Sequence, residues 1–279
     1  MTKLTDAERK PIFDAAKALG IKFNTQDKVD TLDKGINQTL ALLAQRPPPP
    51  VVTTDLDLAP IAPHVPTITL DGLSWPDMLA LITNPHAPAL TDADYQRAAD
   101  RLGNGVTLRH MKASKKVEAP RGAFDDQGRP SILYERHVFA RNTTPKGRFN
   151  TSHPDLSAVR GYGPGSYGAF SAQYAKLAAA YALDPESAFE GCSWGAFQVL
   201  GENALSLGYA SARAMAVELA TSEAAHLDSY VAFIEANSLA DELGQCRAGD
   251  PTSCIPFVSV YNGDGYAKFG YHIKFAAAL

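Results

Sequence analysis

A proline-rich stretch divides this sequence into two unequal parts. Residues 47–89 hold ten of the chain's 19 prolines and begin with four in succession. Proline lacks a backbone N–H and fixes its φ angle, so such a stretch favours an extended spacer over a packed core. Only 73–82 (LSWPDMLALI) has the pattern of a short amphipathic helix, which we expect to pack onto the following domain. We therefore predict a small module at 1–46, a linker at 47–89 and a main domain at 90–279.

The small module carries two helix patterns. Thr5 and Glu8 form a capping-box pair before an apolar face that ends at Gly20. A second apolar face with helical spacing covers 27–45. Two helices of this size bury too little surface to be firmly stable alone. The module is expected either to bind a partner surface or to pack as an appendage, and the sequence leaves both readings open.

The main domain is predicted to be mainly helical. Thr91 is a candidate N-cap for a helix that reaches about Leu102, and further helix patterns cover 172–182 and 211–237. No strand pattern alternates with these helices, which argues against a parallel sheet. A helical domain with at most a small β element is the expected architecture.

Charge and hydropathy argue against several classes of protein. The net charge of −4 is unlike that of a nucleic-acid-binding domain, and no run approaches the ~18 apolar residues of a membrane span. The first ten residues are charged and show no signal peptide, so we expect folding in a cytoplasm. Histidines and cysteines lack metal-ligand spacing. Cys192 is expected to be a buried thiol, and whether Cys246 and Cys254 pair stays open.

Glu118 is the strongest candidate for chemistry. The stretch 106–117 has no helix breaker, and Pro120 disfavours helical geometry in the residue before it, so a helix should end near Glu118. A carboxyl group at the negative end of a helix, beside an apolar turn, should have a raised pKa. A carboxylic acid still protonated near neutral pH is what a glycosidase needs. The alternative is a solvated surface residue that Lys115 and Lys116 keep ionised.

Six short motifs follow one another along the main domain. They are Val117-Glu118, Gly122 with Phe124, Gly128-Arg129-Pro130, Ile132 to His137, Ser193 to Gln198, and Tyr261-Asn262-Gly263. In this order and spacing they resemble the N-acetylmuramidase domain of phage endolysins, in the lysozyme superfamily, and the resemblance covers about 90–279.

The resemblance implies a mainly α, lysozyme-like catalytic domain with a small β element. It implies cleavage of the β-1,4 bond between N-acetylmuramic acid and N-acetylglucosamine in bacterial peptidoglycan, with Glu118 as the general acid and no metal or cofactor. Such a protein would leave the host cytoplasm through a separate membrane pore before it reached the wall, and we expect a monomer. This chain departs from the family at Ala119-Pro120, where Ser-Arg is usual, which alters the turn behind Glu118.

Five further residues are candidate substrate-binding groups. Gly195 could let a sugar approach the backbone closely, and the amide of Gln198 could bond an N-acetyl group. Tyr261 could form a hydrogen bond near Glu118 or the scissile sugar, with a packed tyrosine before an Asn-Gly turn as the alternative. Ser193 and Asn262 complete the set, while Trp194 and Phe197 between them are expected to be core.

Glu135 is the candidate second carboxylate. An inverting glycosidase needs one ~6.5–9.5 Å from the acid to activate water, and a retaining enzyme needs one at ~5–5.5 Å. The alternative is a buried ion pair of Glu135 with Arg136, Arg129 or His137 that holds the Glu118 turn. Weaker candidates for the second carboxylate are Asp125, Asp126 and Asp155.

Three other functions remain compatible with the sequence. A lytic transglycosylase shares the fold and the single glutamate but closes an anhydro ring without water. A chitinase-like specificity is possible on related architecture. A catalytically inactive wall-binding or virion structural protein is favoured by the altered turn after Glu118.

Overall fold

The computed structural model describes residues 69–161 and 167–279. The predicted module at 1–46 and the greater part of the predicted linker lie outside the described residues, so their assignment stays a prediction. Within the described part, no helix is long and apolar enough to cross a membrane.

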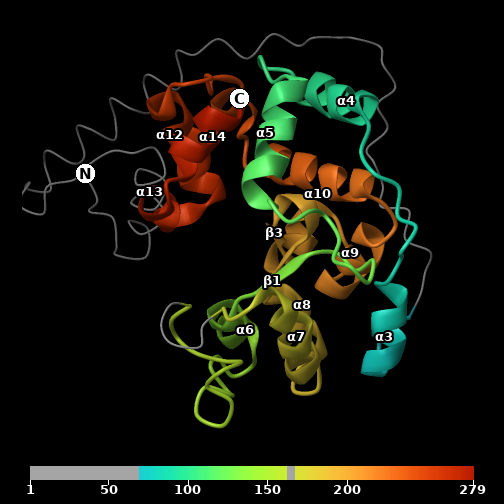
Figure 1. Cartoon of the computed structure of the whole chain (residues 1–279). Coiled ribbons are helices and arrows are strands. Elements are labelled where there is room, and N and C mark those ends of the chain that lie inside the picture. The colour runs from blue at the N-terminus through green and yellow to red at the C-terminus, as the bar shows by residue number, and fades with distance from the viewer. Residues whose placement is uncertain (1–68, 162–166) are drawn as a thin grey trace, which may run out of the picture. The chain divides into compact units, whose positions relative to one another are not determined.

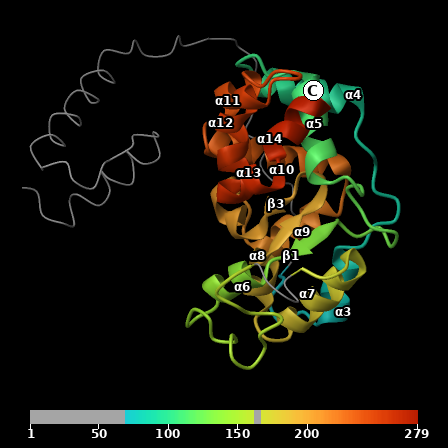
Figure 2. The same cartoon turned by 60° about the vertical axis from the view of Figure 1, so that its left-hand side comes forward.

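The described residues are mainly helical, as expected, with one small sheet (Figures 1 and 2). The helices are α3 (Trp75–Leu81), α4 (Asp92–Leu102), α5 (Leu108–Glu118), α6 (Arg136–Asn142), α7 (Gln173–Tyr181), α8 (Pro185–Glu190), α9 (Ala212–Leu219), α10 (Glu223–Ala236), α11 (Ala240–Gly244), α12 (Pro251–Tyr261), α13 (Tyr266–Phe269) and α14 (Tyr271–Ala278). Single 3-10 turns are η1 (Phe170–Ala172), η2 (Gly195–Phe197) and η4 (Gly263–Gly265), and η3 (Gly201–Leu207) is longer.

The sheet is antiparallel, in the order β1 (Ile132–Tyr134), β2 (Cys192–Trp194), β3 (Val199–Leu200). Leu133 lies opposite Ser193, which in turn lies opposite Leu200. The turn η2 joins β2 to β3, so the Ser193–Gln198 motif is a tight hairpin rather than one continuous strand.

The sheet lies at the waist between two groups of helices (Figure 1). One core, which includes Trp194, is built around α3 and α6 to α9. The other, which includes Phe197, is built around α4, α5, α10, α12 and α14. Both aromatic side chains are almost completely buried, as predicted. Because β2 and η2 supply residues to both cores, the hairpin joins the two halves of the domain.

The helix boundaries follow from local chemistry. Thr91 and Asp94 form a reciprocal capping box at the start of α4, which confirms the predicted cap. Helix α5 ends at Glu118, directly before the Ala119-Pro120 pair, for the predicted steric reason. Cys192 is fully buried, and all three cysteines are free thiols.

The end of the predicted linker packs into the domain. Ser74 caps α3, whose Met78 is fully buried, as is Ile82 directly after the helix. Arg213 on α9 donates to the carbonyl oxygen of Leu70 at 2.6 Å and to the Asp71 carboxylate at 2.8 Å. Leu70 itself belongs to the first core. The chain is therefore part of the folded domain from about residue 70.

Candidate active site

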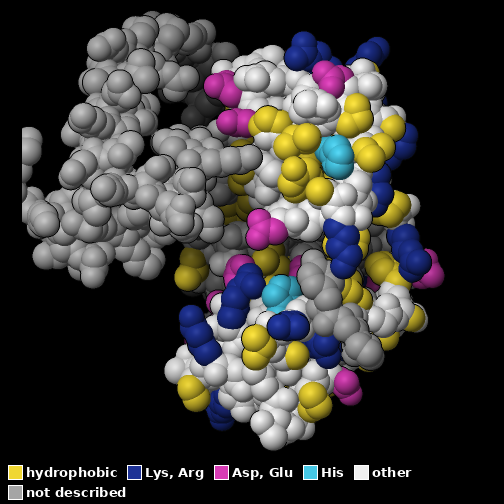
Figure 3. Space-filling view, turned by 90° about the vertical axis from the view of Figure 1, so that its left-hand side faces the viewer, with side chains coloured by type: hydrophobic (Ala, Val, Ile, Leu, Met, Phe, Trp, Pro, Cys, Tyr) yellow, Lys and Arg dark blue, Asp and Glu magenta, His cyan; other side chains and the backbone are white. Residues whose placement is uncertain are grey.

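A cleft of about 880 Å³ crosses the domain at the waist. Figure 3 shows the molecule hollowed between its two halves, with charged side chains of both signs gathered below the hollow. Hydrophobic side chains gather on the half above it. The cleft is lined by residues from α5, β1, α6, β2, β3, α10 and α12 to α14, and they include Glu118, Glu135, His137, Tyr167, Ser193, Gln198, Tyr261 and Asn262.

Glu118 stands at the last position of α5, with its side chain in the cleft wall. The residue keeps some exposure, but protein encloses most of its carboxyl group. This burial raises the pKa of Glu118 to about 7, although a hydrogen bond from Asn262 and the charge of Lys274 act in the opposite direction. The group is therefore close to half protonated at neutral pH, as its sequence position suggested.

Asn262 is the direct partner of Glu118. It lies immediately after α12, and its Nδ2 donates to Glu118 Oε1 at 2.8 Å. An oxygen that accepts this bond keeps its lone pair, so the proton of the neutral acid belongs on Oε2. Asn262 therefore leaves Oε2 without this bond and fixes the orientation of the carboxyl group.

Tyr261 has a structural task as well as a place in the cleft. Its hydroxyl donates to the backbone carbonyl of Phe197 at 2.5 Å, and its ring packs against Tyr230, Phe233 and Phe257. This contact fastens the end of α12 to η2. The hydroxyl of Tyr261 is therefore used within the protein, in line with the packed-tyrosine alternative. The direct hydrogen bond to Glu118 comes from Asn262 instead.

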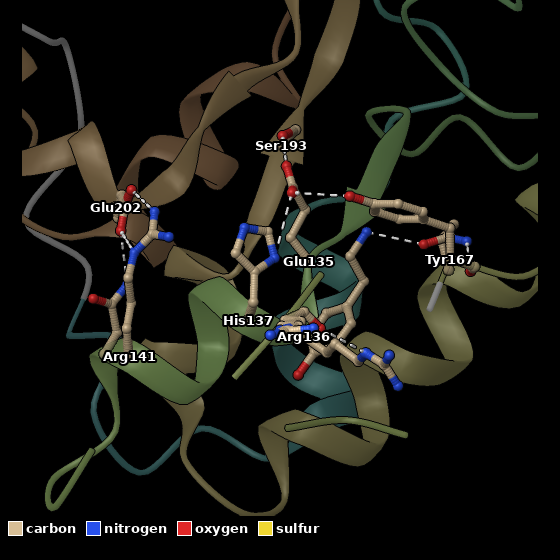
Figure 4. A network of polar contacts seen from close by, with 11 residues as sticks. Glu135, Arg136, His137, Arg141, Tyr167, Ser193 and Glu202 are labelled. Atoms are coloured by element: carbon tan, nitrogen blue, oxygen red, sulfur yellow. Dashed lines mark hydrogen bonds and ion pairs between the residues drawn. The ribbon is translucent and has the colours of Figure 1, made fainter. Parts of the chain in front are cut away.

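Glu135 lines the same cleft and lies in a polar network (Figure 4). Ser193 Oγ donates to its Oε1 at 3.0 Å, Tyr167 Oη lies 3.5 Å from its Oε2, and His137 Nδ1 lies 3.7 Å from that same oxygen. Arg136 instead donates to the carbonyl oxygens of Pro154 and Arg160. Of the three ion-pair partners considered from sequence, only His137 faces Glu135.

The weaker carboxylate candidates do not line this cleft. Asp125 is paired with Arg129 in a separate hollow of about 170 Å³, which Asp126 also lines. Asp155 lines neither cavity. Among the acidic residues predicted from sequence, the structure therefore brings only Glu118 and Glu135 together in the large cleft.

The side chains of Ser193 and Gln198 both form hydrogen bonds within the protein. The hydroxyl of Ser193 is used on Glu135. Gln198 has a left-handed backbone, and its Nε2 donates to the carbonyl oxygens of Gly195 at 2.9 Å and Ser131 at 3.4 Å. No described residue donates to Gln198 Oε1, so this oxygen is left for a ligand in the cleft.

Gly195 is the one substrate-binding candidate that does not line the cleft. Its φ is +69°, and a Cβ atom there would lie 2.5 Å from Nδ1 of the buried His226. The backbone N–H of Ala196 donates to that same nitrogen at 2.9 Å. The expected sugar approach is therefore not the reason for this glycine, since its bare face is turned to a histidine of the core.

Sequence reasoning missed two residues of the site. His137 was considered only as a possible ion-pair partner, and Tyr167 was not singled out. His137 stands two residues after Glu135, so it could have been found by asking which neighbours share its helix turn. Tyr167 belongs to the stretch 141–170, whose richness in Gly, Pro and Asn predicts a long loop that faces the substrate, but this composition does not single out the tyrosine. Among the described residues, no group of His, Cys, Asp and Glu could hold a metal ion.

Comparisons with known proteins point to one family. A family model described as N-acetylmuramidase matches residues 107–279. Among solved structures, the crystal structure of Burkholderia AP3 phage endolysin is similar, with 36% sequence identity and a TM-score of 0.58. That similarity covers 68% of this chain and 69% of the other chain. No curated protein matches.

Proposed function

This chain belongs to the N-acetylmuramidase family and is a peptidoglycan-cleaving enzyme, and from that premise we propose that it hydrolyses the β-1,4 bond between N-acetylmuramic acid and N-acetylglucosamine, with Glu118 as the general acid. The observation that carries this proposal is the carboxyl group of Glu118, which lines the large cleft with a pKa raised to about 7. Such a group is protonated in a large fraction of molecules at neutral pH and can therefore donate a proton.

The proton moves from Glu118 Oε2 to the glycosidic oxygen as the bond to the anomeric carbon breaks. Asn262, bonded to Oε1, holds the carboxyl group during the transfer. Positive charge develops on the sugar ring, and the carboxylate left at position 118 is close enough to the reacting centre to stabilise it. Water then adds to the anomeric carbon, which gives a reducing N-acetylmuramic acid end.

The rest of the cleft supports binding of a polymer. Its volume of about 880 Å³ suits more than one sugar ring. We assign Gln198 Oε1 to an N–H or O–H donor of the sugar, and Tyr261 and Asn262 to the wall beside the scissile bond. Ser193 acts through Glu135 rather than on the sugar.

The context of the reaction is also a proposal. The enzyme is expected to act as a monomer on the bacterial wall after release from the host cytoplasm. The module at 1–46 is expected either to hold the enzyme on peptidoglycan or to pack as an appendage.

Mass spectrometry of the products from purified peptidoglycan tests the reaction. Reducing N-acetylmuramic acid ends are expected, and they should be absent when the variant Glu118→Gln is used at the same concentration. Anhydro-muramic ends would instead identify a lytic transglycosylase. A folded Glu118→Gln variant that cleaves at the wild-type rate would show that Glu118 is not the acid.

A further inference from the structure

We propose that His137, oriented by Glu135, is the base that takes a proton from the attacking water. This inference rests on the proposed hydrolytic function and adds a residue to which no role has been assigned. It divides the work of the second carboxylate between two side chains, a charged one that orients and a neutral one that accepts the proton.

Both oxygens of Glu135 face polar groups of the protein. Oε1 accepts from the Ser193 hydroxyl at 3.0 Å, and Oε2 faces Tyr167 Oη at 3.5 Å and His137 Nδ1 at 3.7 Å (Figure 4). A water molecule bound to Glu135 would share the carboxylate with these three groups. Glu135 is therefore better placed to hold its neighbours than to accept a new proton.

The position of His137 Nδ1 determines the tautomer of the ring. This nitrogen is enclosed and has no hydrogen-bond partner among the described residues, and the charged atom it faces is Glu135 Oε2. A lone pair directed at a carboxylate oxygen would be repelled, so Nδ1 carries the proton. The lone pair of the neutral ring is then on Nε2, the nitrogen on its other side.

His137 Nε2 is available to the cleft. The residue lines the cleft, and Nδ1 is the ring nitrogen that is both enclosed and without a hydrogen-bond partner among the described residues, whereas Nε2 is not enclosed in this way. The ring is also held in place, because a Cβ atom at Gly161 would lie only 2.6 Å from His137 Nδ1. A fixed imidazole with one nitrogen directed to a carboxylate and the other open to a cleft is arranged as a general base.

The surroundings favour a neutral imidazole. Burial is the largest effect and lowers the pKa of His137, and the charges of Arg141 and Arg136 lower it further. Glu135 and Glu202 act in the opposite direction. Glu202 is itself paired with Arg141, so much of that pair's effect cancels. A neutral His137 at neutral pH can accept a proton, which an imidazolium cannot.

The complete step balances. Glu118 Oε2 gives its proton to the leaving oxygen, and the bond between that oxygen and the anomeric carbon breaks. The oxygen of water forms the new bond to the anomeric carbon while one of its protons moves to His137 Nε2. The products are a free sugar hydroxyl and a reducing end. His137 later releases its proton to solvent, and Glu118 takes one back.

The test is the variant His137→Ala in the full-length protein, with His153→Ala, an exposed histidine outside the cleft, as the matched control. We expect kcat on purified peptidoglycan to fall roughly 100-fold or more, as loss of a general base requires, with KM changed only slightly. Added imidazole should restore part of kcat in His137→Ala and in no other variant. The acid limb of the pH–rate profile should also disappear.

A merely structural role of His137 predicts a different pattern. The melting temperature identifies a folding defect, and His137→Gln, which keeps a polar side chain but cannot accept the proton, then serves as the second variant. The proposal is overturned if kcat of a folded variant stays within about threefold of wild type, or if imidazole does not restore it. Anhydro-muramic products would also overturn it, because they need no water. If Glu118→Gln is inactive while His137→Ala is fully active, only the present inference fails.

Discussion

The two glutamates of the cleft lie at opposite kinds of helix end. Glu118 is the last residue of α5, where the helix dipole is negative, whereas Glu135 directly precedes α6, where it is positive. Glu118 is enclosed and receives a single amide donor, whereas Glu135 faces two hydroxyls and an imidazole. The surroundings of Glu118 thus favour a neutral acid, whereas those of Glu135 suit a charged carboxylate. The surroundings, and not the residue type, assign the role.

The largest effects on activity are expected when each of the two carboxyl groups is converted into an amide. Glu118→Gln should lower kcat by roughly 1000-fold or more, because the proton donor is lost. Glu135→Gln should cost less, about 30-fold, because position 135 loses the negative charge that faces His137 Nδ1 at 3.7 Å and accepts from Ser193. Steady-state release of reducing ends from purified peptidoglycan measures both. Equal losses would show that the two carboxyl groups are not specialised in this way.

The raised pKa of Glu118 also predicts a dependence of stability on pH. Because the folded-state pKa of about 7 lies above the ordinary value of 4.5, the folded state binds the proton more tightly than the unfolded state. The contribution of Glu118 to stability should therefore be fully present below pH 4.5 and be lost as pH rises through 7, by about 3 kcal/mol in total. Glu118→Gln removes this loss, so it should be more stable than wild type at pH 8.5 and nearly equal at pH 4.5. Urea unfolding at both pH values measures it, with Asp126→Asn as the control for removal of one charge. A constant difference between Glu118→Gln and wild type would contradict the assignment.

Asn262→Ala is expected to act on Glu118 alone. The Asn262 amide lowers the pKa of Glu118, so its removal should raise that pKa and move the basic limb of the pH–rate profile to higher pH. The rate at the optimum should fall about tenfold, since the carboxyl group loses the bond that orients it. A pH–rate profile of kcat/KM reports both effects. A basic limb that moved to lower pH would contradict this role of Asn262.

Ser193→Ala should have the smallest effect. It removes one neutral donor from Glu135 and leaves Tyr167 and His137 in place. We expect a loss of about 1 kcal/mol in the free energy of unfolding and a rate reduced only a few-fold. Thermal unfolding and the reducing-end assay measure these quantities. A loss as large as that of Glu135→Gln would mean that Ser193 itself contacts the substrate.

The sequence predicted the parts of the site that depend on local geometry. The end of α5 at Glu118 follows from a proline two residues later, and the cap of α4 follows from Thr91 and Asp94. The buried Trp194 and Phe197 follow from their apolar surroundings in the sequence. In each case the residues that cause the local structure lie within a few positions of it, so the local sequence is enough to predict it.

The partners of these residues could not be predicted in the same way. Asn262 bonds a glutamate 144 positions earlier in the chain, and Tyr167 reaches Glu135 from an irregular segment. The family motif indicated that 261–263 lies in the cleft, but which of its side chains meets Glu118 depends on how α12 ends. A glycine can be required either because a ligand approaches the backbone or because another side chain packs against it. The sequence does not show which applies at Gly195, since the contact with His226 comes from a distant part of the chain.

The anchoring of residues 70–82 has a consequence for protein engineering. A designer who wishes to replace the predicted module at 1–46 with a domain of chosen binding specificity must choose a fusion joint. The family match begins only at 107, which invites a cut near that position or at the end of the proline-rich stretch. Such a cut would remove Met78 and Ile82 from the core and leave Arg213 without two of its acceptors. A fragment that keeps the folded domain must therefore begin before Leu70. The part of the chain that can be exchanged is shorter than the family match suggests.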